Sequence, residues 1–215
     1  MIPIGDDNSR RRIVPVVTYG IILLNAIMFF MELTQGEPFI MKWSFIPAEF
    51  MRNPAGEMIT IFTAMFMHGG WMHILSNMLY LWIFGDNVED AFGHIPYLIF
   101  YLVSGIAATF AQLFVDPNST IPNLGASGAI AGVLGAYLVL YPRGTVRVIF
   151  GRALTNMPAL IVIGLWAVLQ LISGLGSITA SGQQGGVAYM AHVGGFIAGL
   201  VLTFLLKGRR KDLQA

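Results

Sequence analysis

Long apolar runs separated by short polar connections dominate the pattern of this 215-residue sequence. A helix that crosses about 30 Å of hydrocarbon needs roughly 20 mostly apolar residues. Six runs come close to that length: residues 13–33, 68–88, 95–115, 124–141, 158–175 and 187–206. Because further spans follow the first run closely, we expect it to be retained rather than removed as a signal peptide. The pattern predicts an all-α membrane protein, a bundle of six transmembrane helices.

The connections between these runs differ in character. Residues 34–60 mix aromatic, basic and acidic side chains, which suits a segment in the membrane interface and equally an external loop with some turn structure. Residues 86–94 are predicted to form an acidic turn, and 142–152 a short basic connection. Residues 173–186 are rich in Gly, Ser and Gln and carry no charge, which predicts a mobile connection.

Composition supports the membrane interpretation. Hydrophobic residues make up 56% of the chain and charged residues only 11%, whereas soluble domains carry about 25% charged residues. The net charge of +1 predicts no nucleic-acid partner. Since the chain has no cysteine, disulfide and thiolate chemistry are excluded.

Basic residues are distributed unevenly between the two sides that six spans would define. Residues 1–12, 142–152 and 207–215 share one side and contain most of the Lys and Arg, whereas only Lys42 and Arg52 lie opposite. The positive-inside rule then places both termini in the cytoplasm. We expect a cytoplasmic tail (1–12), a membrane core (13–206) and a basic cytoplasmic tail (207–215). The expected location is the cell membrane, as in a bacterial inner membrane.

A few polar side chains lie within the apolar runs, where each is costly and therefore a functional candidate. His73 and Asn77 are four residues apart, so they share one helix face. Ser127 follows Gly125 and Ala126 at the head of the fourth run, and His192 lies near the head of the sixth. A lone Ser or His in a membrane helix more often serves packing than chemistry, by bonding to a carbonyl or a neighbouring helix.

Small residues suggest how Ser127 and His192 could meet. Glycines recur at three- and four-residue spacing in the fourth run, and two more stand four residues apart in the sixth. Such stripes allow two membrane helices to approach closely. We expect these stripes to pack together and bring His192 towards Ser127. The glycines concerned are Gly125, Gly128, Gly132, Gly135, Gly195 and Gly199.

The chemistry of these groups is that of acyl transfer. A Ser hydroxyl becomes a nucleophile when a positioned neutral imidazole accepts its proton. The fourth and sixth runs contain no Asp or Glu, so the expected catalytic group is a Ser127–His192 dyad. The backbone N–H of Ser127, the Asn77 amide and a His73 nitrogen could donate to an oxyanion. Alternatively, His73 and Asn77 bond to each other or to loop carbonyls. No metal or other cofactor is predicted.

Three motifs in this order, on six spaced runs, resemble the rhomboid family of intramembrane serine proteases. They are His73-xxx-Asn77, Gly125-Ala-Ser127-Gly128 and Ala191-His192-xx-Gly195. The resemblance covers residues 13–206. It implies that Ser127 is the nucleophile and His192 the base, with an oxyanion site of His73, Asn77 and the Ser127 amide. It also implies a short fourth helix, with Ser127 below the outer surface in a water-filled depression.

The sequence departs from the family pattern at two places. Ile59-Thr60 stands where members often carry a Trp-Arg pair, and Ala131 stands where some carry an aromatic residue that stacks on the catalytic His. We expect His192 to be held instead by packing near Tyr189 or Met190.

The leading functional hypothesis is a protease that acts on transmembrane proteins within the lipid bilayer. It would cleave in or near their membrane segments through an acyl-enzyme. A second hypothesis is a catalytically silent rhomboid-like protein that binds membrane clients. A channel or transporter built on the same polar residues is disfavoured, because no acidic residue lies mid-span and no internal repeat is visible.

Overall fold

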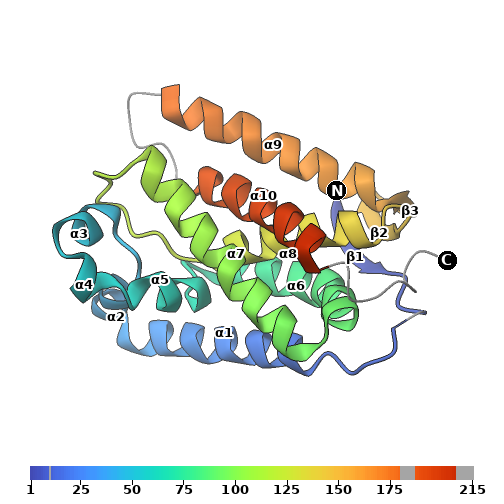
Figure 1. Ribbon diagram of the computed structural model, residues 1–215, viewed down its shortest axis with the longest axis horizontal. Helices are drawn as coiled ribbons and strands as arrows, with labels where there is room; N and C mark the ends of the chain where they lie inside the picture. The colour runs from blue at the N-terminus through green and yellow to red at the C-terminus, as the bar shows by residue number, and fades with distance from the viewer. Residues whose placement is uncertain (10, 180–186, 207–215) are drawn as a thin grey trace.

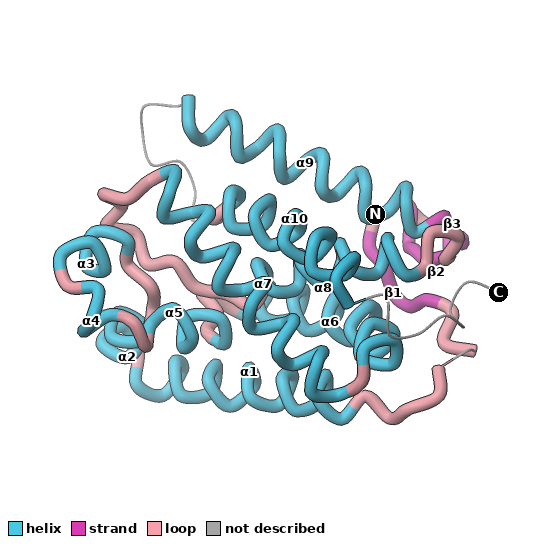
Figure 2. The backbone as a smooth tube through the Cα atoms, viewed as in Figure 1, coloured by secondary structure: helices cyan, strands magenta, loops and turns pink. Residues whose placement is uncertain are grey.

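Six long helices lie side by side in the computed structural model, which describes residues 1–9, 11–179 and 187–206 (Figure 1). Helix α8 occupies the centre of the bundle, and every residue from Gly128 to Tyr137 is buried. The other long helices pack around it, with α1 and α9 on opposite outer sides (Figure 2). Their bounds are α1 (Val16–Gln35), α6 (Trp71–Phe92), α7 (His94–Val115), α8 (Ser127–Leu140), α9 (Ala159–Thr179) and α10 (Tyr189–Leu206).

Several of these helices can cross a membrane. In the described part of the chain, four are long and apolar enough: α1, α7, residues Ala159–Gly176 of α9, and α10. A fifth crossing is possible if α6 and the preceding Pro54–Phe66 segment, bent by 77° against each other, count as one broken span. Helix α8 is apolar but has only 14 residues, which is about 21 Å of helix. The chain is a mainly helical, multi-pass membrane protein, and the sixth predicted crossing stays a prediction.

The connection over residues 34–60 is helical rather than looped. It folds into short pieces that run on to the start of α6. Their position in the membrane interface, one of the two expected alternatives, stays a prediction. The pieces are α2 (Glu37–Trp43), α3 (Pro47–Arg52), α4 (Pro54–Glu57), α5 (Thr60–Thr63) and the 3-10 turn η1 (Ala64–Phe66).

A small antiparallel sheet makes the all-α prediction incomplete. Strands β1 (Ile2–Asp6), β2 (Thr145–Phe150) and β3 (Ala153–Pro158) form a sheet in the order β1-β2-β3, with Ile149 paired to both Ile2 and Leu154. The expected N-terminal tail and the expected basic connection thus pair with each other. In β2 buried valines alternate with exposed residues, a strand pattern, but a segment of six residues within a connection that carries three arginines does not stand out in the sequence.

The acidic segment expected to be a turn is instead the last part of α6. The helix continues to Phe92 and stops at Gly93, whose φ of 83° suits glycine. Asp86, Glu89 and Asp90 are buried there. The prediction failed because charged residues near the end of an apolar run look like a loop, although here their carboxylates have hydrogen-bond partners in the segment before α1, in its first turn and at His94.

Those carboxylates hold the start of α1. Pro15, the residue before α1, provides no side-chain cap. The side chain of Glu89 provides the cap instead. It accepts hydrogen bonds from the backbone N–H groups of Val17 at 2.9 Å and Thr18 at 2.7 Å, and from the Thr18 hydroxyl at 2.6 Å. A carboxylate at a helix N-terminus satisfies free N–H groups and complements the helix dipole.

Two predicted segments lie wholly or partly outside the described residues. Helix α9 extends to Thr179, so the connection predicted over 173–186 begins as helix, and its part from 180 to 186 is not described. The basic tail predicted over 207–215 is also outside the described residues.

We predict that Glu89→Ala will lower the stability of the protein by several kcal/mol. The substitution leaves three donors at the start of α1 without their acceptor, and each unsatisfied buried group costs about 1–3 kcal/mol. Thermal unfolding in one detergent would measure the loss. Glu49→Ala is the control, because Glu49 is exposed on α3 and such changes usually stay within about 0.5 kcal/mol. Equal unfolding temperatures for both variants would contradict the capping role.

Candidate active site

The chain turns sharply just before Ser127. Gly125 has a φ of 133°, which L side chains rarely adopt, and its N–H donates to the carbonyl of Ala64 at 2.8 Å. A Cβ atom at this position would lie 2.8 Å from Nε2 of His73. Glycine is therefore needed at position 125 for the turn and for the closeness of His73, rather than for packing between α8 and α10 as predicted. Helix α8 then begins at Ser127.

Glycines make the contact between α8 and α10. A Cβ atom on Gly195 would overlap the carbonyl oxygen of Gly128, and one on Gly199 would overlap that of Gly132. Between these two helices the backbones themselves touch, as expected for small residues at a membrane helix interface. The contact begins one residue after Ser127 and three residues after His192, so it fixes the distance between them.

Ser127 and His192 are within hydrogen-bonding distance. Oγ of Ser127 lies 2.7 Å from Nε2 of His192. The two residues are 65 positions apart in the sequence and meet because α8 and α10 pack closely. This is the geometry that a hydroxyl nucleophile and an imidazole base require.

Helix α9 supplies two further contacts of His192, and α10 supplies a third. Nδ1 of His192 lies 2.7 Å from Oε1 of Gln170. The Trp166 ring, one helical turn earlier, lies 5.8 Å from the imidazole at an angle of 38°. Tyr189, one of the two residues expected to hold His192, contacts it edge-on at 6.5 Å. Trp166 thus provides the aromatic contact that Ala131 cannot.

Gln170 was not among the residues predicted from the sequence. The signal that could have revealed it is its amide within an otherwise apolar span, because polar groups at membrane depth are costly. Its four-residue spacing from Trp166 places both side chains on one face of α9. The spacing alone does not say which helix that face contacts.

His73 and Asn77 lie next to Ser127, and they do not hydrogen-bond to each other in the described structure. Nδ1 of His73 lies 3.3 Å from the backbone N–H of Gly69 and accepts from it. In a neutral ring the hydrogen is then on Nε2, which can donate. Nδ2 of Asn77 is buried and has no partner among the described residues. A buried donor without an acceptor is unusual in a native protein, so the Asn77 amide is available to an acceptor atom of a bound molecule or of water.

Five of the side chains described above line one cleft, whereas Gln170 and Tyr189 are not among its walls. Its volume is about 750 Å³, and its walls include Ser127, His192, His73, Asn77 and Trp166. The remaining walls are mostly apolar, and a mainly apolar cleft with a few converging polar groups is typical of a ligand-binding site.

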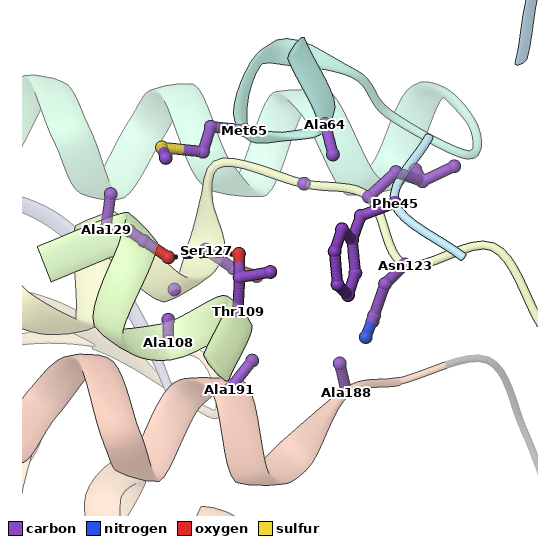
Figure 3. A pocket seen from close by; sticks show the side chains of 14 residues that line it. Phe45, Ala64, Met65, Ala108, Thr109, Asn123, Ser127, Ala129, Ala188 and Ala191 are labelled. Atoms are coloured by element: carbon purple, nitrogen blue, oxygen red, sulfur yellow. Dashed lines mark hydrogen bonds between the residues drawn. The ribbon is translucent and has the colours of Figure 1, made fainter. Parts of the chain in front are cut away.

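A second, smaller pocket also reaches Ser127 (Figure 3). Figure 3 shows Ala108 and Thr109 on α7, and Ala188 and Ala191 beside or on α10, around it. More than half of its lining residues are glycine or alanine, and the larger side chains among the others include Phe45, Met65 and Leu124.

Helix α5 begins at the two positions, Ile59 and Thr60, where the family pattern often has a Trp-Arg pair. Thr60 is buried and donates its hydroxyl hydrogen to the carbonyl of Glu57 at 2.7 Å, whereas Ile59 is exposed. Neither residue lines the cleft. The described residues also contain no group of three or more His, Cys, Asp or Glu that could hold a metal ion.

Comparison with known proteins assigns the class of protein. The Rhomboid domain family matches residues 55–209. The chain is 34% identical over 194 residues to the rhomboid protease GluP of Bacillus subtilis, covering 87% of this chain and 35% of that protein. It is 28% identical over 196 residues to the putative rhomboid protease YdcA of the same organism, covering 90% of this chain and 89% of that protein.

The similarity extends to eukaryotes. RHOMBOID-like protein 5 of Arabidopsis thaliana is 32% identical over 151 residues, which is 70% of this chain and 45% of the plant protein. The chain therefore spans about a third to a half of several of the relatives it matches. The chain belongs to the rhomboid family.

We predict that Gly195→Ala will destabilise the protein by about 1–3 kcal/mol, the usual effect of overpacking. The added methyl group meets the Gly128 carbonyl and must push α10 away from α8. The matched control is Gly164→Ala on α9, where an added Cβ meets no described atom within 4 Å. That variant should be unchanged or slightly more stable. Equal thermal stability of the two variants would show that the helix contact is not tight.

Proposed function

We propose that this chain is an intramembrane serine endopeptidase that cleaves transmembrane proteins in or near their membrane segment. The single observation that supports this most is the 2.7 Å distance between Oγ of Ser127 and Nε2 of His192. Membership of a family that includes proteins named as proteases supports the same conclusion.

The proposed reaction begins with attack by Ser127 on the carbonyl carbon of the scissile peptide. His192 accepts the hydroxyl proton at Nε2 as the C–O bond forms, and then gives it to the departing amine as the C–N bond breaks. The product is an acyl-enzyme on Ser127. Water, deprotonated by the same nitrogen, hydrolyses this ester and restores the serine.

Three donors are proposed to stabilise the negative oxygen of each tetrahedral intermediate. They are the amide of Asn77, Nε2 of His73 and the backbone N–H of Ser127. The first is buried without a partner among the described residues, and the second carries the ring hydrogen because Nδ1 accepts from Gly69. The third is in the first turn of α8, where no side-chain cap competes for it.

The proposed membrane arrangement has six crossings, with both termini in the cytoplasm. The proposed location is the cell membrane. Because α8 is short, Ser127 would lie below the outer surface, in a depression that admits water. Substrates would be transmembrane proteins, whose peptide bonds are accessible only after local unwinding, since a helix protects its backbone with internal hydrogen bonds.

A fluorophosphonate probe separates this function from that of a silent client-binding relative. The probe should label Ser127 covalently, because only an activated serine attacks phosphorus at a useful rate. Labelling should disappear in Ser127→Ala and His192→Ala. Ser76→Ala is the matched control: Ser76 lines the same cleft, but its hydroxyl donates to the carbonyl of His73. Failure of the folded wild-type protein to react would overturn the proposal.

Asn77→Ala should reduce kcat by about 100- to 1,000-fold, the usual loss when one oxyanion donor is removed. Asn77→Asp should be at least as damaging, since it replaces the donor with a group of the wrong charge. Steady-state cleavage of one single-span substrate in fixed detergent measures both effects. If Asn77→Ala changed KM alone, Asn77 would bind substrate without stabilising the oxyanion.

A further inference from the structure

Helix α9 presents two side chains to His192. Trp166 packs on the imidazole ring at 5.8 Å between centroids, and Oε1 of Gln170 lies 2.7 Å from Nδ1. The two residues are one turn apart. The imidazole is thus bonded at both nitrogens, to Ser127 from α8 and to Gln170 from α9.

The bond to Gln170 determines where the ring hydrogen lies. A neutral imidazole carries one hydrogen, on either Nδ1 or Nε2. His192 can accept the Ser127 proton only when Nε2 has none, and Nδ1 must then carry the hydrogen and donate it. The partner of Nδ1 is the amide oxygen of Gln170, which can only accept a hydrogen bond. This bond therefore favours the tautomer that can act as a base.

We propose that Gln170 is a positioning residue that fixes the reactive tautomer and the ring orientation of His192, a role that rests on the proposed function. It is the third member of the hydrogen-bonded chain Gln170–His192–Ser127. Because Gln170 is on α9, three helices position this chain: α8 carries Ser127, α10 carries His192 and α9 carries Gln170.

The amide suits this place better than a carboxylate would. An acid buried at membrane depth carries a large desolvation cost while His192 is neutral, whereas an amide accepts the same hydrogen bond without charge. An amide also stabilises the imidazolium less than a carboxylate does, so Gln170 contributes mainly orientation. The titratable groups near His192 are Tyr189 on its own helix and His73 on α6.

The experiment compares two substitutions at position 170. Gln170→Met keeps the length of the side chain but removes the acceptor, and Gln170→Glu keeps an acceptor and adds charge. Leu171→Met is the matched control, since Leu171 is the next residue on α9 and is exposed. Each purified variant is tested for thermal stability, fluorophosphonate labelling rate, kcat and KM, and the pH profile of cleavage.

Gln170→Met should lower kcat and the labelling rate by about 10- to 100-fold with little change in KM, because a misplaced base slows the chemical step. Leu171→Met should match the wild type. Gln170→Glu should retain more activity than Gln170→Met, and the acidic limb of its pH profile should move to higher pH, because a carboxylate favours the protonated imidazole.

Nitrogen NMR of the ring, labelled with ¹⁵N at histidine, gives a second result that does not depend on activity. The His192 signals should report hydrogen on Nδ1 in the wild type and a mixture of both tautomers in Gln170→Met. Unchanged tautomer and unchanged kcat in Gln170→Met would overturn the proposal, as would equal losses in the Met and Glu variants. If the wild type does not label at all, the protease function fails, while the NMR result still decides whether Gln170 sets the tautomer.

Discussion

The backbone contact between α8 and α10 is the constraint on which the site depends. Two membrane helices gain little from the hydrophobic effect when they associate, so close van der Waals packing must hold them together. Here the Cβ atoms missing from Gly195 and Gly199 leave room for the carbonyls of Gly128 and Gly132. The same contact sets the 2.7 Å spacing of Ser127 and His192. Packing and chemistry therefore share one surface, and changes to either are expected to affect both.

Two acidic side chains stabilise the fold, one at each end of α1. The carboxylate of Glu89 is fully buried, yet it has hydrogen-bond donors from the start of α1 and lies 2.6 Å from Nδ1 of His94. Glu32, near the end of α1, likewise accepts the backbone N–H of His68 at 2.9 Å, just before α6. These bonds fix α1 against α6 at both ends. Helix α6 carries His73 and Asn77, so α1 helps to position the two side chains that are proposed to stabilise the oxyanion.

The sequence allowed the helical membrane class and the rhomboid family to be predicted, because long apolar runs and three spaced motifs are strong signals. It also indicated Ser127, His192, His73 and Asn77, whose contacts follow from helix faces and glycine stripes. The sheet was missed because β1 and β2 are distant in the sequence and short. Gln170 was missed because a single polar residue shows its role only when its partner helix is known. Gly125 was assigned to packing because spacing alone does not reveal a turn.

The most direct measurement of the central claim is cleavage in a lipid bilayer. The purified protein would be reconstituted in vesicles with a panel of single-span proteins, and the products mapped by mass spectrometry. The account predicts cuts in or near the membrane segment, absent with Ser127→Ala. It also predicts one ¹⁸O atom in the new carboxyl group when the reaction runs in H₂¹⁸O, as hydrolysis of an acyl-enzyme requires. Cleavage that persists in Ser127→Ala, or no cleavage of any span by the folded wild type, would contradict it.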